Sequence, residues 1–369
     1  MSQHLSLRRT GTALAASALA ATLVATGLAG GATPAQAVSS SSPAGHAATW
    51  LAGQLNKNGL IHNPNFGGFD DYGLTADTVL GLTAIGGHHQ DVMRARRALA
   101  AHVSDYTTFE TDRYAGSTAK LLVVAQQTGA SPRHFGGVNL VKRLALRVAT
   151  TAPIAGRIED KSTSGDFANV VGQIFAVRGL LGAGSSSGTD ALRFLLEQQC
   201  RNGSFRLNFN ADKTAADQGC AKGDPADTDV TALAVVELTA VAKGHPGLKR
   251  ALGDATSWLR RNQNDNGSFG GSGPTSAANA NSTGRAGWAF LTTRTCRPAR
   301  DAADWLAKLQ VRGNVSGTPL AHELGAIAYD HAALKAARQD GIDKAARDQW
   351  RRAGAQAAPA LVALSHCGS

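Results

Sequence analysis

The stretch Trp258-Leu259-Arg260-Arg261-Asn262-Gln263-Asn264-Asp265-Asn266-Gly267-Ser268-Phe269 recurs in variant form at three other places in the chain. The shared order is an aromatic residue, Leu, a Gln and then a tight Gly turn. It is found again at residues 50–60, 194–205 and 305–313, where the turn glycines are Gly59, Gly203 and Gly313. One such unit cannot bury its apolar face alone, so repetition predicts units that stack on their neighbours.

The spacing of these stretches predicts how many units there are. They start at residues 50, 194, 258 and 305, so the last two intervals are 64 and 47 residues and the first is 144, about three times 48. Two weaker units are therefore expected in the long interval, and amphipathic segments at 93–104 and 138–150 fit them. The chain divides into six helix pairs, and a final helix over 342–364 closes the end.

Each pair combines a charged outer helix with an inner helix that is apolar nearly all round. The inner helices are expected at 74–85, 114–127, 167–181, 229–242, 284–292 and 320–333. Helices that are apolar all round are packed on two sides. The prediction is an all-α fold, an α/α toroid of six inner and six outer helices in a closed barrel.

In such a ring all inner-helix N-termini emerge at the same end, where capping residues such as Thr75 with Asp77 and Ser164 with Asp166 are expected. Six positive helix dipole ends would surround one opening, which is the place that the sequence favours for a site. The ligand-binding candidates are the polar and aromatic residues near these helix starts: Tyr72, Asp77, Tyr114, Asp166, Asn169, Trp288 and His322.

The first residues have the form of an export signal. Arg8 and Arg9 precede a small-residue apolar run, and Ala35-Gln36-Ala37 fits a signal-peptidase site. We therefore expect a signal peptide at 1–37, a short Ser-rich linker at 38–46 and one toroid domain at 47–369, secreted as a monomer. Loss of the two arginines lowers the net charge from +10 to +8. The basic clusters are interpreted as solvated outer faces of surface helices and not as nucleic-acid contacts. A charge of this size allows association with an anionic cell-envelope polymer.

Four cysteines in an exported chain predict two disulfides, for which three connectivities are possible. We favour Cys200 with Cys220, because they bracket the loop after the second stretch, and Cys296 with Cys367, which would tie the C-terminal helix to the body. A metal site is the weaker interpretation, because no C-x-x-C occurs. No metal and no cofactor are predicted.

The repeated stretch resembles the Gln-Trp repeat of triterpene cyclases, with Phe205 and Phe269 in place of the closing Trp. The chain thus resembles the terpenoid cyclase and protein prenyltransferase α/α-toroid superfamily, which also includes cobalamin carriers of the transcobalamin type. The resemblance implies the toroid fold but not an activity, because members range from cyclases to carriers. The zinc-dependent branch fits worse, since no inner-helix start carries the cysteine ligand.

Asp227-Thr228-Asp229-Val230-Thr231-Ala232 is similar to the acid motif of class II terpene cyclases, which implies Asp229 as proton donor beside Asp227. Val230 stands where the family has a further Asp, so the acid would be poorly set up. The favoured interpretation is that both residues cap a helix, as Asp77 would in Thr75-Ala76-Asp77.

Three functions stay open at this point. The first is an exported, non-catalytic toroid that binds a small molecule or a cell-envelope component at the inner-helix N-terminal opening. The second is a class II terpene-cyclase-like enzyme with Asp229 as the acid, which 5% aromatic content disfavours because such cavities are lined with aromatic rings. The third is a structural or interaction module without a ligand.

Overall fold

The computed structural model describes residues 38–65 and 67–367. The predicted signal peptide lies outside these residues. Helices joined by turns and long loops make up the described chain, and its strands form two short antiparallel hairpins, β1 (His62–Asn63) with β2 (Phe69–Asp70) and β3 (Thr108–Phe109) with β4 (Asp112–Arg113). In their registers, His62 lies opposite Asp70 and Thr108 lies opposite Arg113.

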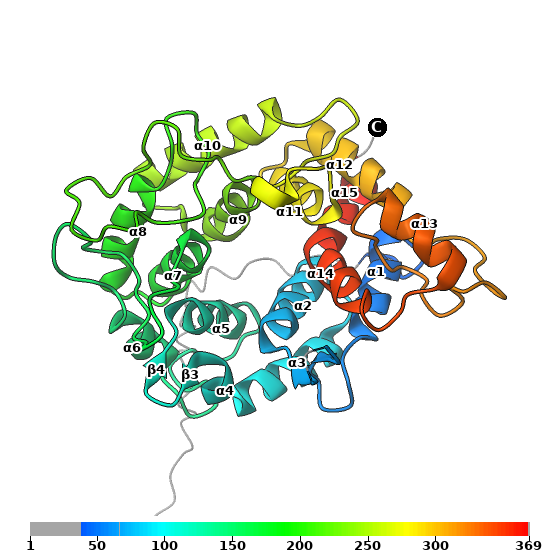
Figure 1. Cartoon of the computed structure of the whole chain (residues 1–369), viewed down its shortest axis with the longest axis horizontal. Coiled ribbons are helices and arrows are strands. Elements are labelled where there is room, and N and C mark those ends of the chain that lie inside the picture. Colours follow the sequence, from blue (N-terminus) through cyan, green and yellow to red (C-terminus); the bar gives the residue numbers. More distant parts are fainter. Residues whose placement is uncertain (1–37, 66, 368–369) are drawn as a thin grey trace, which may run out of the picture. The chain divides into compact units, whose positions relative to one another are not determined.

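Six helices form an inner ring, in which each helix packs against the next one and the last packs against both its predecessor and the first. Figure 1 shows these helices around the centre and the other helices outside them. The inner helices are α2 (Tyr72–Ile85), α5 (Ala115–Gln127), α7 (Val170–Gly182), α9 (Thr228–Leu238), α11 (Ala280–Thr292) and α14 (Arg347–Ala357).

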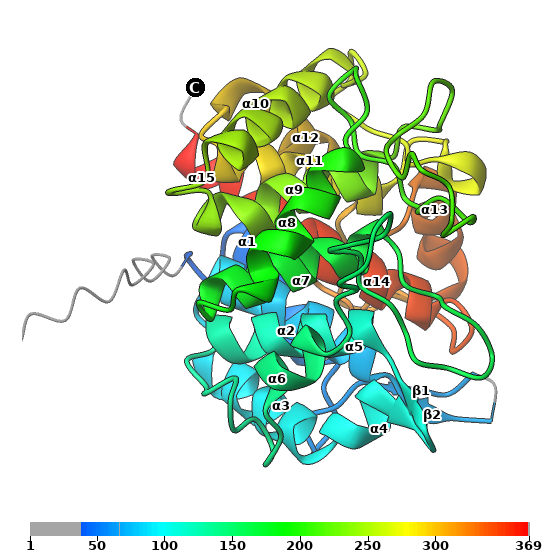
Figure 2. The same cartoon turned by 90° about the vertical axis from the view of Figure 1, so that its left-hand side faces the viewer.

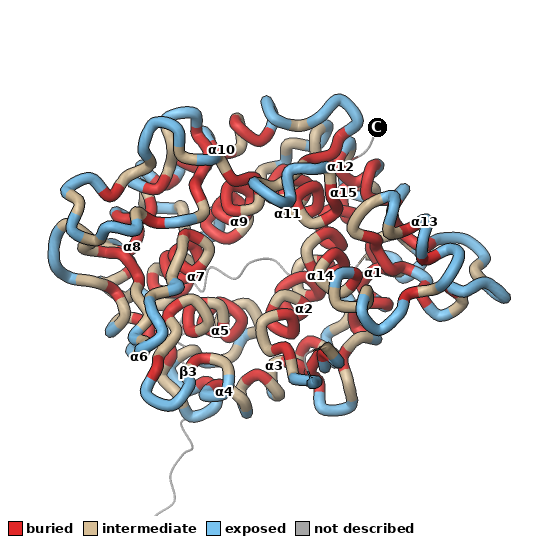
Figure 3. Tube along the Cα trace, viewed as in Figure 1, coloured by how far each residue is buried: buried red, intermediate tan, exposed pale blue. Residues whose placement is uncertain are grey.

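The outer helices pack against the inner ring, and the α/α-toroid prediction is confirmed. They are α1 (Pro43–Ala52), α3 (His89–Ala101), α6 (Leu140–Ala145), α8 (Ser187–Glu197), α10 (Pro246–Arg261) and α12 (Cys296–Leu309). Short elements complete the chain: α4 (Val103–Thr107), η1 (Thr239–Val241), η2 (Gly273–Thr275), α13 (His331–Asp340), η3 (Ala358–Val362) and α15 (Ala363–His366). Buried residues concentrate in the inner ring and its contacts, whereas exposed segments lie at the periphery (Figure 3).

In the second and third copies of the repeated stretch the glutamine connects one unit to the next, whereas Gln54 of the first copy donates to the Trp50 carbonyl oxygen at 3.3 Å. The Nε2 amide of Gln263 donates to the carbonyl oxygen of Gly267, 3.0 Å away, and to that of Pro298 in α12, also at 3.0 Å. Gln199 makes the same pair of bonds with Gly203 and with Ala251 in α10. Each glutamine thus joins its own turn to the following outer helix.

The aromatic residues of the repeated stretch belong to the scaffold, as their recurrence suggests. The side chains of Trp50, Phe194, Trp258 and Trp305 are all buried. Trp50 also donates from Nε1 to Glu323 Oε2 at 2.7 Å.

The last unit differs from the prediction. Gln310 bonds to the carbonyl oxygens of Gly325 and of Pro43 in α1, so the turn glycine of this unit is Gly325 and not Gly313. Residues 320–328 form turns, so the inner helix predicted at 320–333 is wrong. The sixth inner helix is α14, which lies inside the segment 342–364 that was expected only to close the end.

Two further details of the sequence prediction are settled. The first helix begins at Pro43, so residues 43–46 are helical and do not belong to a linker. Both favoured disulfides, Cys200 with Cys220 and Cys296 with Cys367, are confirmed. None of the helices in the described part of the chain is both long and apolar enough to cross a membrane.

The turn glycines support a test of the repeat contact. Gly267 has φ +87°, and a Cβ there would collide with the carbonyl oxygen of Asp301 in α12. We expect Gly267→Ala to lower the free energy of unfolding by about 2 kcal/mol or more, measured by urea unfolding. The control is Gly253→Ala in α10, where a Cβ meets nothing within 4 Å and helix propensity predicts a gain of up to about 1 kcal/mol. Equal effects of the two substitutions would contradict this account.

Candidate functional site

The inner-helix N-termini lie at one end of the ring, together with the long connections, both hairpins and α13 (Figure 2). A cleft of about 540 Å³ opens there, between residues 206–211, residues 217–225 and Ser272. Arg206, Asp224 and Ser272 give it a polar wall. Arg206 is buried and donates to Gln198 Oε1 and to Asp224 Oδ2, so the loop that carries it is held in place. The loops at this end of the ring therefore enclose a polar hollow.

A common hydrogen bond fixes three of the inner-helix starts. The Oγ1 atoms of Thr75, Thr231 and Thr283 accept from the backbone N–H groups of Ile61, Phe205 and Phe269, which follow the Gly turns. In each case the threonine stands four residues after the N-cap, which is Asp71, Asp227 or Asn279. The repeat thus determines where each of these inner helices begins.

Asp227 is the cap of α9, as predicted, and its Oδ1 accepts from the backbone N–H of Val230 at 2.9 Å. Its Oδ2 accepts from the hydroxyl of Ser272. Asp229 is not a cap, which corrects the favoured interpretation. Its Oδ1 is buried without a hydrogen-bond partner, and burial raises the pKa of the carboxyl although the charge of Arg285 opposes this.

Four of the ligand-binding candidates hold the rim of the opening together. Tyr72 stacks on the His102 ring, with centroids 5.4 Å apart, and its hydroxyl lies 3.3 Å from His102 Nδ1. Tyr114 precedes α5, and its hydroxyl donates to Asp112. Asn169 caps α7 by accepting from the N–H of Gly172. Asp166 pairs with Arg157 at 3.0 Å and with Lys213 at 2.8 Å, so it clips two loops together and caps no helix.

Two other candidates differ in outcome. His322 is exposed in the turns of residues 320–328 and starts no inner helix, so its predicted position is wrong. Trp288 lies on the partly exposed face of α11, three residues after Arg285. It therefore shares a helix face with an arginine that belongs to the centre of the ring.

Asp77 is the one carboxyl candidate that reaches the centre. It was expected to cap α2, but Asp71 is the cap and Asp77 is the sixth residue of the helix. Lys120 and Arg285 are the sixth residues of α5 and α11 in the same way. Asp77 Oδ1 accepts from Lys120 Nζ at 2.8 Å, and this ammonium lies 5.6 Å from the centroid of the Phe175 ring, the sixth residue of α7. Side chains at one helical position thus form a layer across the ring.

A second layer lies about one turn further along the helices. Arg178 in α7 and Glu237 in α9 interact electrostatically there, and Gln127 donates from Nε2 to Glu237 Oε2 at 3.2 Å. Burial raises the pKa of Glu237 to about 7, while the charges of Arg178 and Arg285 act in the opposite direction. Burial disfavours the charged form of Arg178 as well and therefore lowers its pKa, whereas the charge of Glu237 acts to raise it.

These side chains come from five inner helices, and the charge of one shifts the pKa of another. Because such effects act over short distances, the side chains must lie together in the middle of the ring. We call the set Asp77, Lys120, Arg178, Glu237 and Arg285 the central charge cluster. Asp77, Lys120, Arg178 and Arg285 keep partial solvent exposure. Lys120, Arg178 and Glu237 are not among the predicted site residues, because only the helix starts were considered. The available signal was a single charged residue in each of α2, α5, α7 and α11, and Glu237 near the end of the apolar helix α9.

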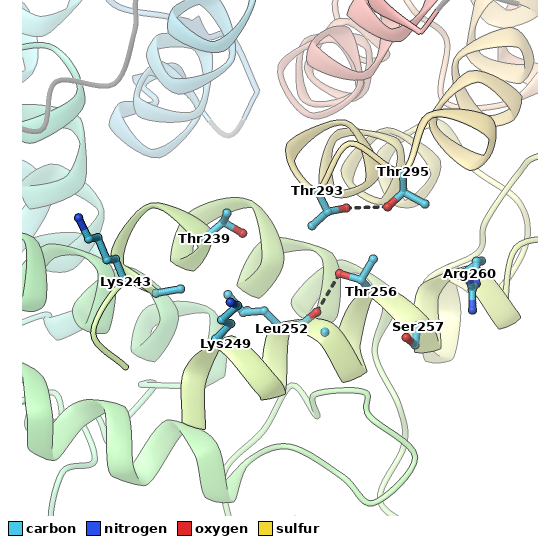
Figure 4. A pocket seen from close by; sticks show the side chains of 11 residues that line it. Thr239, Lys243, Lys249, Leu252, Thr256, Ser257, Arg260, Thr293 and Thr295 are labelled. Carbon is cyan, nitrogen blue, oxygen red and sulfur yellow. Dashed lines mark hydrogen bonds between the residues drawn. The ribbon is translucent and has the colours of Figure 1, made fainter. Parts of the chain in front are cut away.

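A separate groove lies at the opposite ends of the inner helices. It measures about 590 Å³ and runs between one face of α10 and the residues that follow α9 and α11 (Figure 4). Two of its hydroxyl groups donate to backbone carbonyls, Thr256 to that of Leu252 and Thr293 to that of Ala289. Lys243, Lys249 and Arg260 also line the groove, and none of them belongs to the inner ring.

No group of three or more His, Cys, Asp and Glu side chains among the described residues is placed to hold a metal ion. In the central charge cluster, Asp77 and Glu237 each lie near a cation, which opposes binding of a further positive charge.

Solved structures share this architecture at low sequence identity. The type II terpene cyclase MstE from Scytonema superposes with a TM-score of 0.59 and 15% identity, covering 88% of this chain and 98% of the cyclase. The fold is that of the α/α toroids. An α-1,6-mannanase of Salegentibacter gives a TM-score of 0.58 at 12% identity, covering 87% of this chain and 99% of the enzyme.

An unsaturated glucuronyl hydrolase specific for heparin gives a TM-score of 0.58 at 12% identity, covering 88% of this chain and 96% of that one. No family model matches the sequence, and no curated protein matches it significantly. The neighbours at these identities establish the fold and leave the activity to be argued from the residues.

The raised pKa of Glu237 predicts a pH dependence of stability. Folding favours the neutral carboxyl, so this contribution is complete below about pH 4.5 and is lost as the pH rises through 7. We expect the wild type to lose at most about 3 kcal/mol of unfolding free energy between pH 5 and pH 8 in excess of Glu237→Gln. Urea unfolding across this range measures it, with substitution of the exposed Asp265 by Asn as control. Parallel curves for the wild type and Glu237→Gln would contradict the assignment.

Proposed function

We propose that this chain is an exported, non-catalytic α/α-toroid protein that binds a small polar molecule, such as a fragment of the cell envelope, at the central charge cluster. The observation that carries the proposal is the meeting of ionisable side chains from five inner helices in one place. Buried charges are costly unless they are paired, so their retention in the middle of a helical core favours a role beyond packing.

The chemistry of the cluster favours a polar ligand over a hydrocarbon. An isoprenoid placed against Lys120, Arg178 and Arg285 would remove water from three cations without replacing their hydrogen bonds. A ligand with hydroxyl or acidic groups would replace those bonds. The fold is shared both with a terpene cyclase and with enzymes named for a mannan and for heparin, and the charges of the cluster favour a carbohydrate-like molecule as the kind of ligand.

The carboxyls of α9 favour binding over hydrolysis. Asp229 and Glu237 are eight residues apart on one helix, a rise of about 12 Å, which exceeds the separation of a glycosidase carboxyl pair. Asp227 is nearer to Asp229, but both of its oxygens accept hydrogen bonds as a helix cap and from Ser272. Neither pair is arranged for acid and base catalysis on a glycosidic bond.

The proposal is tested by screening the purified protein with native mass spectrometry against corrinoids, isoprenoids, mannose oligomers and acidic sugars. We expect retention of a polar ligand and an increase of the melting temperature by a few degrees at saturation. Lys120→Met should reduce binding at least tenfold, whereas Arg260→Met, at an exposed position of α10, should not change it. Retention of isoprenoids alone would contradict the proposal, and retention of nothing would favour an interaction module.

A second candidate function is a terpene-cyclase-like enzyme with Asp229 as proton donor. The observation in its favour is that burial shifts the Asp229 carboxyl toward its protonated form, which a proton donor must have before it reacts. We expect no cyclisation of squalene or of geranylgeranyl dihydroxybenzoate, measured by mass spectrometry of the products. If turnover is found and Asp229→Asn abolishes it while the exposed Asp265→Asn retains it, the enzyme is established and the non-catalytic proposal is wrong.

A further inference from the structure

The positive charges of the central charge cluster exceed what its own carboxylates neutralise. Lys120 forms an ion pair with Asp77 at 2.8 Å. Arg178 and Arg285 form no ion pair with another side chain among the described residues, since neither is within 4.0 Å of a carboxylate oxygen. Because Asp77 is paired with Lys120, Glu237 is the other carboxyl of the cluster. It is a single carboxyl beside the two guanidinium groups of Arg178 and Arg285.

The hydrogen bonds of the two arginines are also incomplete. Arg178 Nε is buried and has no partner. Arg285 Nε donates to Gln356 Oε1 at 3.2 Å, a neutral acceptor. A guanidinium has five N–H donors arranged for carboxylate or phosphate oxygens, and a buried one is costly without them. The two arginines therefore have N–H donors that an anion could accept from, and no carboxylate in the described part of the chain accepts from them.

The surroundings strengthen this preference. Glu237 is buried and carries a raised pKa, so at neutral pH its negative charge is only partly present. Asp229, next to the opening, is likewise shifted toward its neutral form by burial. The inner helices also direct their positive dipole ends toward the same opening. The negative charge that opposes an anion at the cluster is thus smaller than the number of carboxyls there suggests.

We propose that the ligand of the central charge cluster is an anion, a molecule with a carboxylate or phosphate group that Arg178 and Arg285 hold, with Lys120 contributing charge. This inference rests on the proposed function and names the chemical class of its ligand. Both arginines are partly exposed, so an anion that enters the ring can reach their N–H groups. Charge-assisted, bidentate bonds to guanidinium would fix its orientation.

A matched pair of ligands provides the test, because glucuronate and glucose differ by one carboxylate. Inorganic phosphate at constant ionic strength is the third probe. By isothermal titration calorimetry we expect glucuronate or phosphate to bind at least tenfold more tightly than glucose. Arg178→Met and Arg285→Met should each remove that preference, Arg178→Lys should keep part of it, and the surface variant Arg260→Met should keep all of it.

Stability gives a readout that needs no ligand. At pH 6, where Glu237 is mostly neutral, Arg178→Met removes a partly buried cation whose Nε has no hydrogen-bond partner. We expect its melting temperature to equal or exceed that of the wild type while anion binding is lost. A marked fall in melting temperature would assign Arg178 to the scaffold and overturn the inference.

The outcomes separate this inference from the function it rests on. If glucose or another neutral ligand binds as tightly as the anions, and the arginine variants bind it normally, the anion inference is wrong and the binding function stands. If neither the anions nor any member of the wider polar panel is retained, the binding function fails and the inference fails with it.

Discussion

The structure depends on one hydrogen-bonded contact, in which a glutamine amide donates to the carbonyl of its own Gly turn and to a carbonyl of the next outer helix. Gln199 and Gln263 make it between successive units, and Gln310 makes it from the last unit to Pro43 in the first. In the interval without a full stretch, Gln173 on α7 replaces the loop glutamine and bonds to Gly156 and Ala191. Closure of the ring brings the sixth residues of distant helices together, so the charged centre follows from this contact.

The fold could be predicted from the sequence where the residues that make the repeat contact lie close together in a recognisable local pattern. Trp258, Gln263 and Gly267 could be recognised because the contact requires those residue types at that spacing. The prediction for the last unit was wrong because Gln310 bonds to a turn at Gly325, fifteen residues later in the chain. The sixth inner helix was missed because α14 carries arginines and resembles an outer helix. These charges are accommodated inside by long-range pairs, Arg347 with Glu323 and Arg352 with Asp71.

The candidate site was predicted less well than the fold, and for a physical reason. Capping is a local interaction, so residues near helix starts could be proposed from the sequence, and Asp227 and Asn169 do cap their helices. The cluster is formed by non-local pairs: Asp77 meets Lys120 across 43 residues, and Gln127 meets Glu237 across 110. Such a partner is known only once the ring has placed the helices side by side. The remaining signal in the sequence was the shared position of Asp77, Lys120 and Arg285 as the sixth residue of their helices.

The fold accommodates both hydrocarbon-cyclising and glycan-cleaving enzymes, so the lining of the ring decides its chemistry. A cyclase acid must be strong, which requires hydrogen bonds that stabilise the carboxylate it leaves behind. Burial has the opposite effect on Asp229, because it raises the pKa and makes the carboxyl a weaker acid. Its Oδ1 has no hydrogen-bond partner that would reverse this, and the residue after it is Val230, where the similar motif of class II terpene cyclases has a further Asp. Beside Arg285, a neutral Asp229 leaves the arginine's charge available to a ligand. Burial of Asp229 therefore makes it a weaker proton donor and at the same time favours binding of an anion at Arg285.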